Sequence, residues 1–179
     1  MFTGHVRRIG RRGAAAAAAL AALGALACAA PRVQPPATRA SLERLAAAAT
    51  TDIYGRPASL AAVLADRAVV YVFRTDCRYC AAGLATARVL AARPESPVLV
   101  LVSREDAARL KAAIGPVPPK RLVVLADPSG ALMDSALVTR FVPRVIAVAG
   151  FRVLLDQTGQ GGPGLERAAE IAASWGRER

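Results

Sequence analysis

Histidine is almost absent from this chain of 179 residues. The one histidine, His5, lies in a basic, alanine-rich N-terminal segment, so the remainder of the chain has none. This excludes Ser-His-Asp and Cys-His hydrolases and metal sites built on histidine. Aromatic residues make up only 4% of the chain, and they are seldom interleaved with basic residues as in nucleic-acid-binding surfaces. Nucleic acid is therefore not an expected partner.

Cysteine is rare as well, with three residues in the chain. Hydrophobic residues make up 54% and charged residues 21%, which is typical of a globular chain rather than a disordered one. A domain of about 150 residues buries roughly two thirds of the surface of its unfolded chain. Folding therefore requires neither a disulfide nor a structural metal.

Residues 1–28 have the plan of an export signal. Residues 1–13 contain four arginines and no acid, and residues 13–31 carry no charge. A basic start, an apolar centre and small residues at the exit are typical of a secretory signal. The segment Ala25-Leu26-Ala27-Cys28 is similar to a bacterial lipoprotein box, in which Cys28 would carry the lipid. Plain cleavage and an uncleaved membrane anchor are the alternatives.

The proline-rich composition of residues 29–40 predicts a linker, which we extend over residues 29–50 with a short helix at 41–49. Residues 51–179 then form the working domain. Removal of residues 1–27 takes away four arginines and no acid, which leaves 20 basic and 13 acidic residues, or +7. We expect these charged side chains to form a solvated surface. Binding of anionic lipid or of an acidic partner is the alternative.

Apolar runs and amphipathic segments alternate along the working domain. The predicted strands cover residues 68–73, 98–102, 121–126, 144–149 and 152–155. The predicted helices cover residues 59–64, 81–92, 104–114, 131–139 and 165–175. Buried strands alternating with helices, followed by a terminal hairpin and helix, predict the α/β class with a mixed sheet covered on both faces.

Cys77 and Cys80 lie where the strand 68–73 gives way to a helix. The free amides and the dipole at a helix N-terminus stabilise a thiolate on Cys77. Cys80 lies one turn further on, close enough to attack a mixed disulfide. Zinc sites share the Cys-x-x-Cys spacing, but a second pair of ligands is missing from the sequence. The motif therefore predicts dithiol–disulfide exchange and no metal.

From about Asp52 to Trp175 the chain resembles the thioredoxin superfamily, and most closely the exported, membrane-tethered thiol-disulfide oxidoreductases of the TlpA type. The matching pieces are, in chain order, Gly55–Leu60, the strand 69–73 with Cys77–Cys80, Leu125–Gly130, and Val142-Pro143 followed by two strands. The resemblance implies a thioredoxin fold in the periplasm or cell envelope, with no cofactor beyond the redox-active disulfide. It also implies client proteins that carry disulfides or thiols, a membrane electron donor and the reducing direction.

The same resemblance assigns roles to single residues. Cys77 would be the nucleophile and Cys80 the resolving thiol. Pro143 would follow a cis peptide bond facing the disulfide, and Val142 would offer its backbone to an extended client. Tyr79 is expected either to contact the client or to pack against the domain.

Three positions depart from the family pattern. Asp76 stands where the family usually has tryptophan, and its carboxylate raises the pKa of Cys77, whereas Arg78 and Arg74 lower it, so the balance stays open. Tyr71 stands where thioredoxins keep a buried acid for proton transfer. Arg144 follows Pro143 in place of the common threonine, and it is expected either to meet an acidic substrate or to lie on the surface.

Without the acid at position 71, proton transfer is either absent or assisted from elsewhere in the sequence, by Glu43 or Asp52. These departures also support an alternative function from another class. The thioredoxin fold would then act as a binding module, either for extended peptides or for Cu(I). The thiolates of Cys77 and Cys80 are soft ligands of the kind that Cu(I) prefers. Neither form of the module would need redox turnover.

Overall fold

A five-stranded mixed sheet forms the centre of the domain, with the strand order β3-β2-β1-β4-β5. This computed structural model describes residues 33–48 and 51–176. The strands are β1 (Arg67–Val72), β2 (Val98–Ser103), β3 (Leu122–Ala126), β4 (Arg144–Ala149) and β5 (Arg152–Thr158). β2 pairs in parallel with β1 and β3, whereas β4 pairs antiparallel with β1 and β5.

Both faces of the sheet are apolar, because the central strands are almost continuous runs of branched and aromatic residues. Successive side chains of a strand point to opposite faces. In β1, Val69 and Tyr71 belong to one core cluster, and Val70 and Val72 belong to the other. A strand that is buried on both sides requires a layer of helices over each face.

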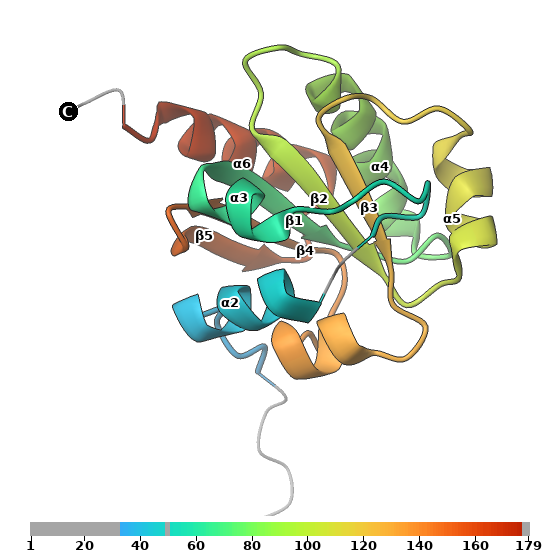
Figure 1. Cartoon of the computed structure of the whole chain (residues 1–179), viewed down its shortest axis with the longest axis horizontal. Helices are drawn as coiled ribbons and strands as arrows, with labels where there is room; N and C mark the ends of the chain where they lie inside the picture. Colours follow the sequence, from blue (N-terminus) through green and yellow to red (C-terminus); the bar gives the residue numbers. More distant parts are fainter. Residues whose placement is uncertain (1–32, 49–50, 177–179) are drawn as a thin grey trace, which may run out of the picture. The chain divides into compact units, whose positions relative to one another are not determined.

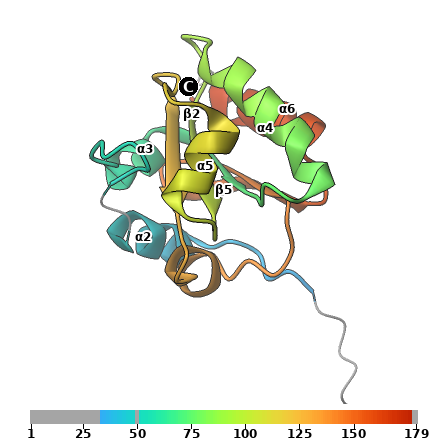
Figure 2. The same ribbon diagram turned by 90° about the vertical axis from the view of Figure 1, so that its right-hand side faces the viewer.

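Helices supply those two layers (Figures 1 and 2). The first layer contains α4 (Arg78–Ala91), α5 (Ala107–Ile114) and α6 (Gly162–Ser174). The second contains α2 (Arg39–Ala48), α3 (Leu60–Ala65) and the π-helical segment η1 (Ala131–Ala136). The predicted α/β class with a mixed, doubly covered sheet is therefore confirmed.

Several boundaries differ from the sequence prediction. β5 continues to Thr158 instead of ending at residue 155, because it pairs with β4 as far as Arg144. The helix predicted over residues 131–139 is the shorter segment η1. Helix α6 begins at Gly162 rather than at residue 165. In each case long-range pairing or packing, which local sequence does not record, sets the end of the element.

Residues 34–48, which the sequence assigns to a linker over residues 29–50, belong instead to the folded unit Gln34–Arg179. Helix α2 buries Leu42 and Leu45 completely in the second core cluster. Its start is capped by reciprocal hydrogen bonds: the Ser41 N–H donates to Thr38 Oγ1, and the Thr38 N–H donates to Ser41 Oγ. The linker prediction is wrong here because the apolar face of this helix covers the sheet.

The predicted signal, residues 1–28 with Cys28, lies outside the described residues. In residues 33–48 and 51–176, none of the helices has both the length and the apolar character that a membrane span requires.

Candidate active site

Cys77 and Cys80 form a disulfide at the start of α4, with their Cα atoms 5.2 Å apart. Cys77 occupies the N-cap position and is partly exposed, whereas Cys80 is fully buried inside the first turn. The Cys80 N–H donates to the Cys77 carbonyl at 2.9 Å. This placement gives Cys77 access to another molecule and leaves Cys80 behind it, which is the arrangement that disulfide exchange requires.

Tyr71 lies directly beneath the second cysteine. Its hydroxyl donates to the Cys80 carbonyl at 3.1 Å, and its ring is stacked on that of Phe73. Burial raises the pKa of the Tyr71 phenol far above its ordinary value of 10.0. Gly83 makes room for this hydroxyl, because a Cβ at that position would overlap it. Tyr71 therefore holds the first turn of α4 as a neutral hydrogen-bond donor.

The two acids suggested as a substitute proton relay are engaged elsewhere. Glu43 pairs with Arg39 on the exposed surface of α2. Asp52 is buried and pairs with Arg56, and it also accepts the backbone N–H of Tyr54. Within the described residues, both carboxylates bond to these groups and not to the disulfide, so the relay hypothesis gains no support from their positions.

Asp76, directly before the first cysteine, forms a two-point ion pair with Arg74 at 2.9 and 2.6 Å. The hydrogen bonds from Arg74 hold the pKa of the Asp76 carboxyl below its ordinary value, so the carboxylate stays ionised at neutral pH. Because the two charges lie together, each offsets the influence of the other on the Cys77 thiol. The N-terminus of α4 and the neighbouring guanidinium of Arg78 then remain to stabilise a thiolate.

Glu105 braces the loop before the disulfide, and the sequence analysis missed it. Its carboxylate accepts the Thr75 N–H at 3.0 Å and the Thr75 hydroxyl, and it pairs with Arg109 at 3.0 Å. One signal could have revealed it: Glu105 follows β2, which runs parallel to β1. The carboxyl ends of parallel neighbours meet at one edge of the sheet, so residues just beyond β2 reach the loop just beyond β1.

The dipeptide between the cysteines is exposed. The guanidinium of Arg78 lies 4.5 Å from the centre of the Tyr79 ring and also contacts the Tyr79 hydroxyl. The Tyr79 side chain remains 57% exposed, so packing against the core does not explain it. Its backbone carbonyl is closely approached by Gly161, where a Cβ would overlap it. The loop before α6 therefore packs closely against the turn that carries the disulfide.

The Val142–Pro143 peptide bond is cis, as the resemblance implies. Val72 pairs with Arg144 in the antiparallel register of β1 and β4, so Pro143 enters β4 at the edge where β1 leads to the disulfide. The Pro143 carbonyl accepts from Gly159 at 2.9 Å. Within residues 33–48 and 51–176, neither the N–H nor the C=O of Val142 forms a backbone hydrogen bond.

Arg144 is the clearest correction to the sequence analysis, since it neither lies on the surface nor faces a substrate. It is fully buried and pairs with Asp156 at 2.9 and 2.7 Å. Its remaining N–H groups donate to backbone and side-chain oxygens of three residues: Pro35, Leu137 and Thr139. A buried charge is tolerated here because every donor of the guanidinium has an acceptor.

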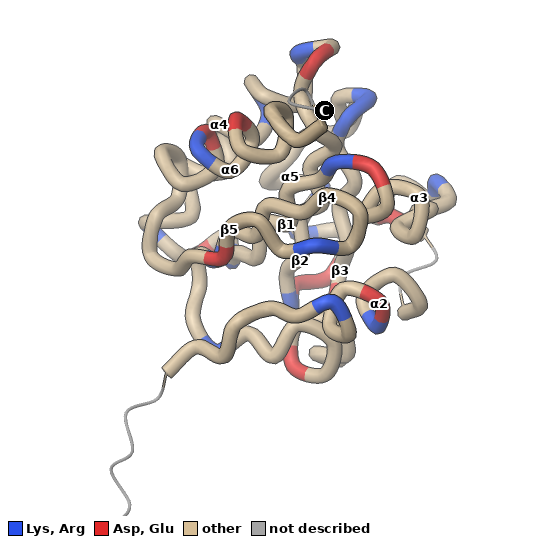
Figure 3. Tube along the Cα trace, turned by 90° about the vertical axis from the view of Figure 1, so that its left-hand side faces the viewer, with Lys and Arg blue, Asp and Glu red and all other residues tan. Residues whose placement is uncertain are grey.

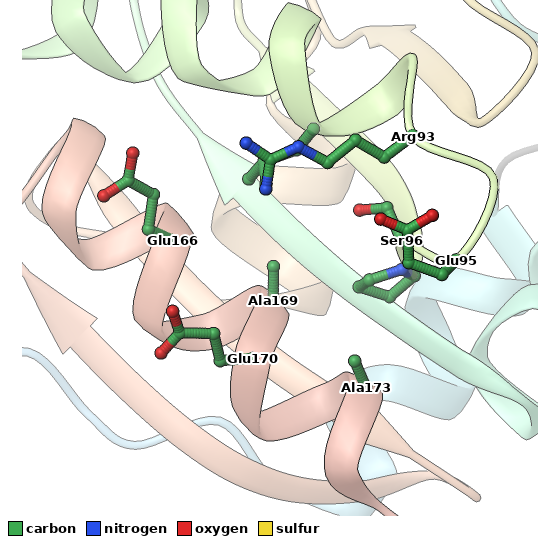
Figure 4. Close-up of a pocket in the computed structure, with 9 residues that line it drawn as sticks. Arg93, Glu95, Ser96, Glu166, Ala169, Glu170 and Ala173 are labelled. Carbon is green, nitrogen blue, oxygen red and sulfur yellow. The ribbon is translucent and has the colours of Figure 1, made fainter.

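Charged positions are interspersed along the side of the domain shown in Figure 3, and no single-sign face is evident there. A separate pocket of about 250 Å³ lies between the loop after α4 and the helix α6. Figure 4 shows Glu95, Glu166 and Glu170 around it together with Arg93. Because this pocket lies at the C-terminal end of α4, a helix length away from Cys77, it takes no part in the disulfide site.

No family model matches the chain, and no curated protein matches it by sequence. Solved structures do resemble it. One is a secreted disulfide oxidoreductase of Mycobacterium tuberculosis described as homologous to E. coli DsbE, with a TM-score of 0.58 and 18% sequence identity. The match covers 73% of this chain and 98% of that one.

Two further structures are similar. DsbF of M. tuberculosis has a TM-score of 0.56 at 18% identity, over 72% of this chain and 97% of its own. The exposed lipoprotein thioredoxin Etrx1 of Streptococcus pneumoniae has a TM-score of 0.54 at 18% identity, over 68% and 96%. At such identities the likeness concerns the fold. The chain therefore has the fold of the thioredoxin-like thiol-disulfide oxidoreductases, with its own cysteine pair at the start of α4.

Proposed function

We propose that this protein is an exported thiol-disulfide oxidoreductase that exchanges disulfides with client proteins through Cys77 and Cys80, in the reducing direction. One observation carries the proposal: an accessible and a buried cysteine form a disulfide at a helix N-terminus, at the same sheet edge as the cis Val142–Pro143 bond. The exchange needs no cofactor beyond the cysteine pair.

The reaction begins with the reduced pair. The Cys77 thiolate attacks one sulfur of a client disulfide, and the other client sulfur leaves as a thiolate. Cys80 loses its proton and attacks the Cys77 sulfur, which breaks the mixed disulfide and releases the client with two thiols. Two electrons pass from the cysteine pair to the client, and the pair becomes a disulfide. The two client sulfurs take up the proton that Cys80 loses and one further proton from water. A dithiol-type donor in the membrane then returns two electrons to it.

The client would lie along the segment before Pro143. Val142 is partly exposed and its backbone groups are unpaired within the described part of the chain, so both can bond to an extended client strand. Tyr79, in the turn between the cysteines, and Phe141, next to Val142 in the chain, are 57% and 45% exposed and offer apolar contact. Binding through backbone groups suits an enzyme with many clients, because it does not depend on the client side chains.

The envelope is the proposed location. The plan of residues 1–28 supports export, and two proteins of similar fold are described as secreted and as an exposed lipoprotein. A lipid on Cys28 would hold the domain at the membrane, near the electron donor, and would place the protein closest to the TlpA-type enzymes. Mass spectrometry of the envelope-extracted protein tests this step, since a diacylglyceryl group on Cys28 adds a defined mass and plain cleavage adds none.

Trapping of the mixed disulfide tests the proposed activity. A Cys80→Ser variant keeps the nucleophile but cannot resolve the intermediate, so exported clients should accumulate on Cys77 as adducts that dithiothreitol releases. The Cys77→Ser/Cys80→Ser variant is the matched control and should trap nothing. Absence of adducts from Cys80→Ser, together with one-to-one binding of Cu(I) by the reduced wild type, would favour the binding-module alternative.

A further inference from the structure

The side-chain amide of Gln34 is fully engaged with the loop that leads into the cis proline. Its Oε1 accepts the backbone N–H of Arg140 at 2.8 Å and that of Phe141 at 3.2 Å. Its Nε2 donates to the carbonyl of Val138 at 2.9 Å and to that of Pro35 at 3.1 Å. Two donors meet two carbonyls and one oxygen meets two N–H groups, so the network also fixes which way the amide points.

The loop that Gln34 contacts needs external support. Val138 has a positive φ of 50°, a strained conformation that β-branched residues rarely adopt unless the surroundings impose it. Residues 138–142 lie outside the helices and strands, between η1 and β4. The bonds from Gln34 replace the backbone partners that a neighbouring strand would supply.

A second anchor joins the same two segments. The buried guanidinium of Arg144 donates to the carbonyl of Pro35 on one side and to that of Leu137 on the other, each at 2.9 Å. Asp156, its ion-pair partner, accepts the backbone N–H of Ala37 at 2.6 Å. Residues 34–37 are thus bonded to both ends of the loop over residues 137–144, more than 100 positions later in the chain.

We propose that Gln34 is a positioning residue for client binding: its amide holds residues 138–141 so that the backbone of Val142 is presented to an extended client chain. The inference rests on the proposed exchange activity. It adds that the segment around Gln34 positions the backbone to which the client binds. Gln34 contacts neither cysteine in the described structure, so its removal should affect client binding rather than the chemistry of the disulfide.

The test compares two substrates in the full chain, purified in detergent. Insulin offers a backbone next to its disulfides, whereas a small aromatic disulfide such as dithiobis(nitrobenzoate) offers none. Gln34→Ala should raise the KM for insulin about fivefold, the equivalent of about one hydrogen bond at 1 kcal/mol. It should leave kcat, the rate with the small disulfide and the reduction potential unchanged.

Two further variants sharpen the comparison. Gln34→Glu keeps an oxygen that accepts the N–H groups of Arg140 and Phe141, but it places a second oxygen against the Val138 carbonyl. The KM of this variant for insulin should therefore lie between that of the wild type and that of Gln34→Ala. Arg39→Ala, which removes an exposed side chain paired with Glu43, is the matched control and should behave as wild type. Hydrogen exchange at the Arg140 and Phe141 amides should accelerate in Gln34→Ala, independently of activity.

The outcomes separate the two claims. A wild-type protein that reduces insulin, with Gln34→Ala unchanged in KM and in amide exchange, would overturn this inference and leave the proposed function standing. A parallel loss of rate with both substrates would also overturn it, since that pattern marks general damage to the fold. A wild-type protein that leaves insulin disulfides intact would contradict the proposed function itself.

Discussion

Replacement of Arg144 by methionine should destabilise the domain strongly. The guanidinium is fully buried, and each of its five N–H groups has an acceptor, two of them on Asp156. Methionine fills much of the same volume but donates nothing. It would leave the Asp156 carboxylate, only 13% exposed, without its cation, and the carbonyls of Pro35 and Leu137 without their donor.

The size of the effect follows from the burial of the pair. Removal of one partner from a buried ion pair costs about 3–5 kcal/mol, because the other charge stays desolvated and uncompensated. For a domain of about 150 residues this corresponds to a fall in Tm of roughly 6–20 °C. It is a large part of a total stability that lies near 5–15 kcal/mol for typical domains.

Urea unfolding followed by circular dichroism measures this loss. Arg39→Met is the matched control, because the Arg39–Glu43 pair has side chains 70% and 52% exposed and should contribute less than about 1 kcal/mol. The double variant Arg144→Met/Asp156→Leu should be more stable than Arg144→Met alone, since it removes the orphaned charge. If Arg144→Met loses no more than the surface control, the account of this residue is refuted.

Three more predictions concern the disulfide and its support. Gly83→Ala should lower the unfolding free energy by about 1–3 kcal/mol in urea titrations, because the new Cβ overlaps the Tyr71 hydroxyl; a gain, as in an exposed helix, would contradict the packing. Asp76→Asn should lower the pKa of the Cys77 thiol, since it removes a carboxylate and leaves the charge of Arg74 unpaired; thiolate absorbance of the reduced protein reports the shift, and a rise would contradict this reasoning. Because the folded-state pKa of Tyr71 is raised above its ordinary 10.0, its contribution to stability is present below pH 10 and is lost as pH rises further. Above pH 10 the unfolding free energy of the wild type should therefore fall more steeply with pH than that of Tyr71→Phe, by up to about 1.4 kcal/mol per pH unit. Identical pH profiles would show that the phenol is not buried.

The sequence predicted those parts of the fold that depend on local pattern. The apolar strand before Cys77 and the helix after it are contiguous in the chain, so their junction and the place of the two cysteines at the start of the helix could be predicted. The resemblance also predicted the cis bond before Pro143, which spacing alone does not encode. The alternation of apolar and amphipathic segments predicted the mixed sheet and the helices on both of its faces.

Long-range polar partners could not be predicted in the same way. Gln34 bonds to residues more than 100 positions away, and nothing near it in the sequence marks that contact. Arg144 was expected to meet an acidic substrate or to lie on the surface, where arginine is usually found, and the last predicted strand stopped one residue before its partner Asp156. Tyr71 was seen only as a missing acid, since the space that Gly83 leaves for its hydroxyl exists only after α4 has packed on the sheet.

A redox titration of the Cys77–Cys80 pair tests the central claim most directly. The protein is equilibrated with dithiothreitol buffers of stepped potential, and the fraction of free thiols is counted by alkylation and mass spectrometry. The account predicts one reversible two-electron transition near the potential of thioredoxin, about −270 mV, as a reductase requires. A midpoint near −120 mV, as in a strong oxidant, would contradict the proposed direction, and failure of the pair to form a reversible disulfide would contradict the exchange activity itself.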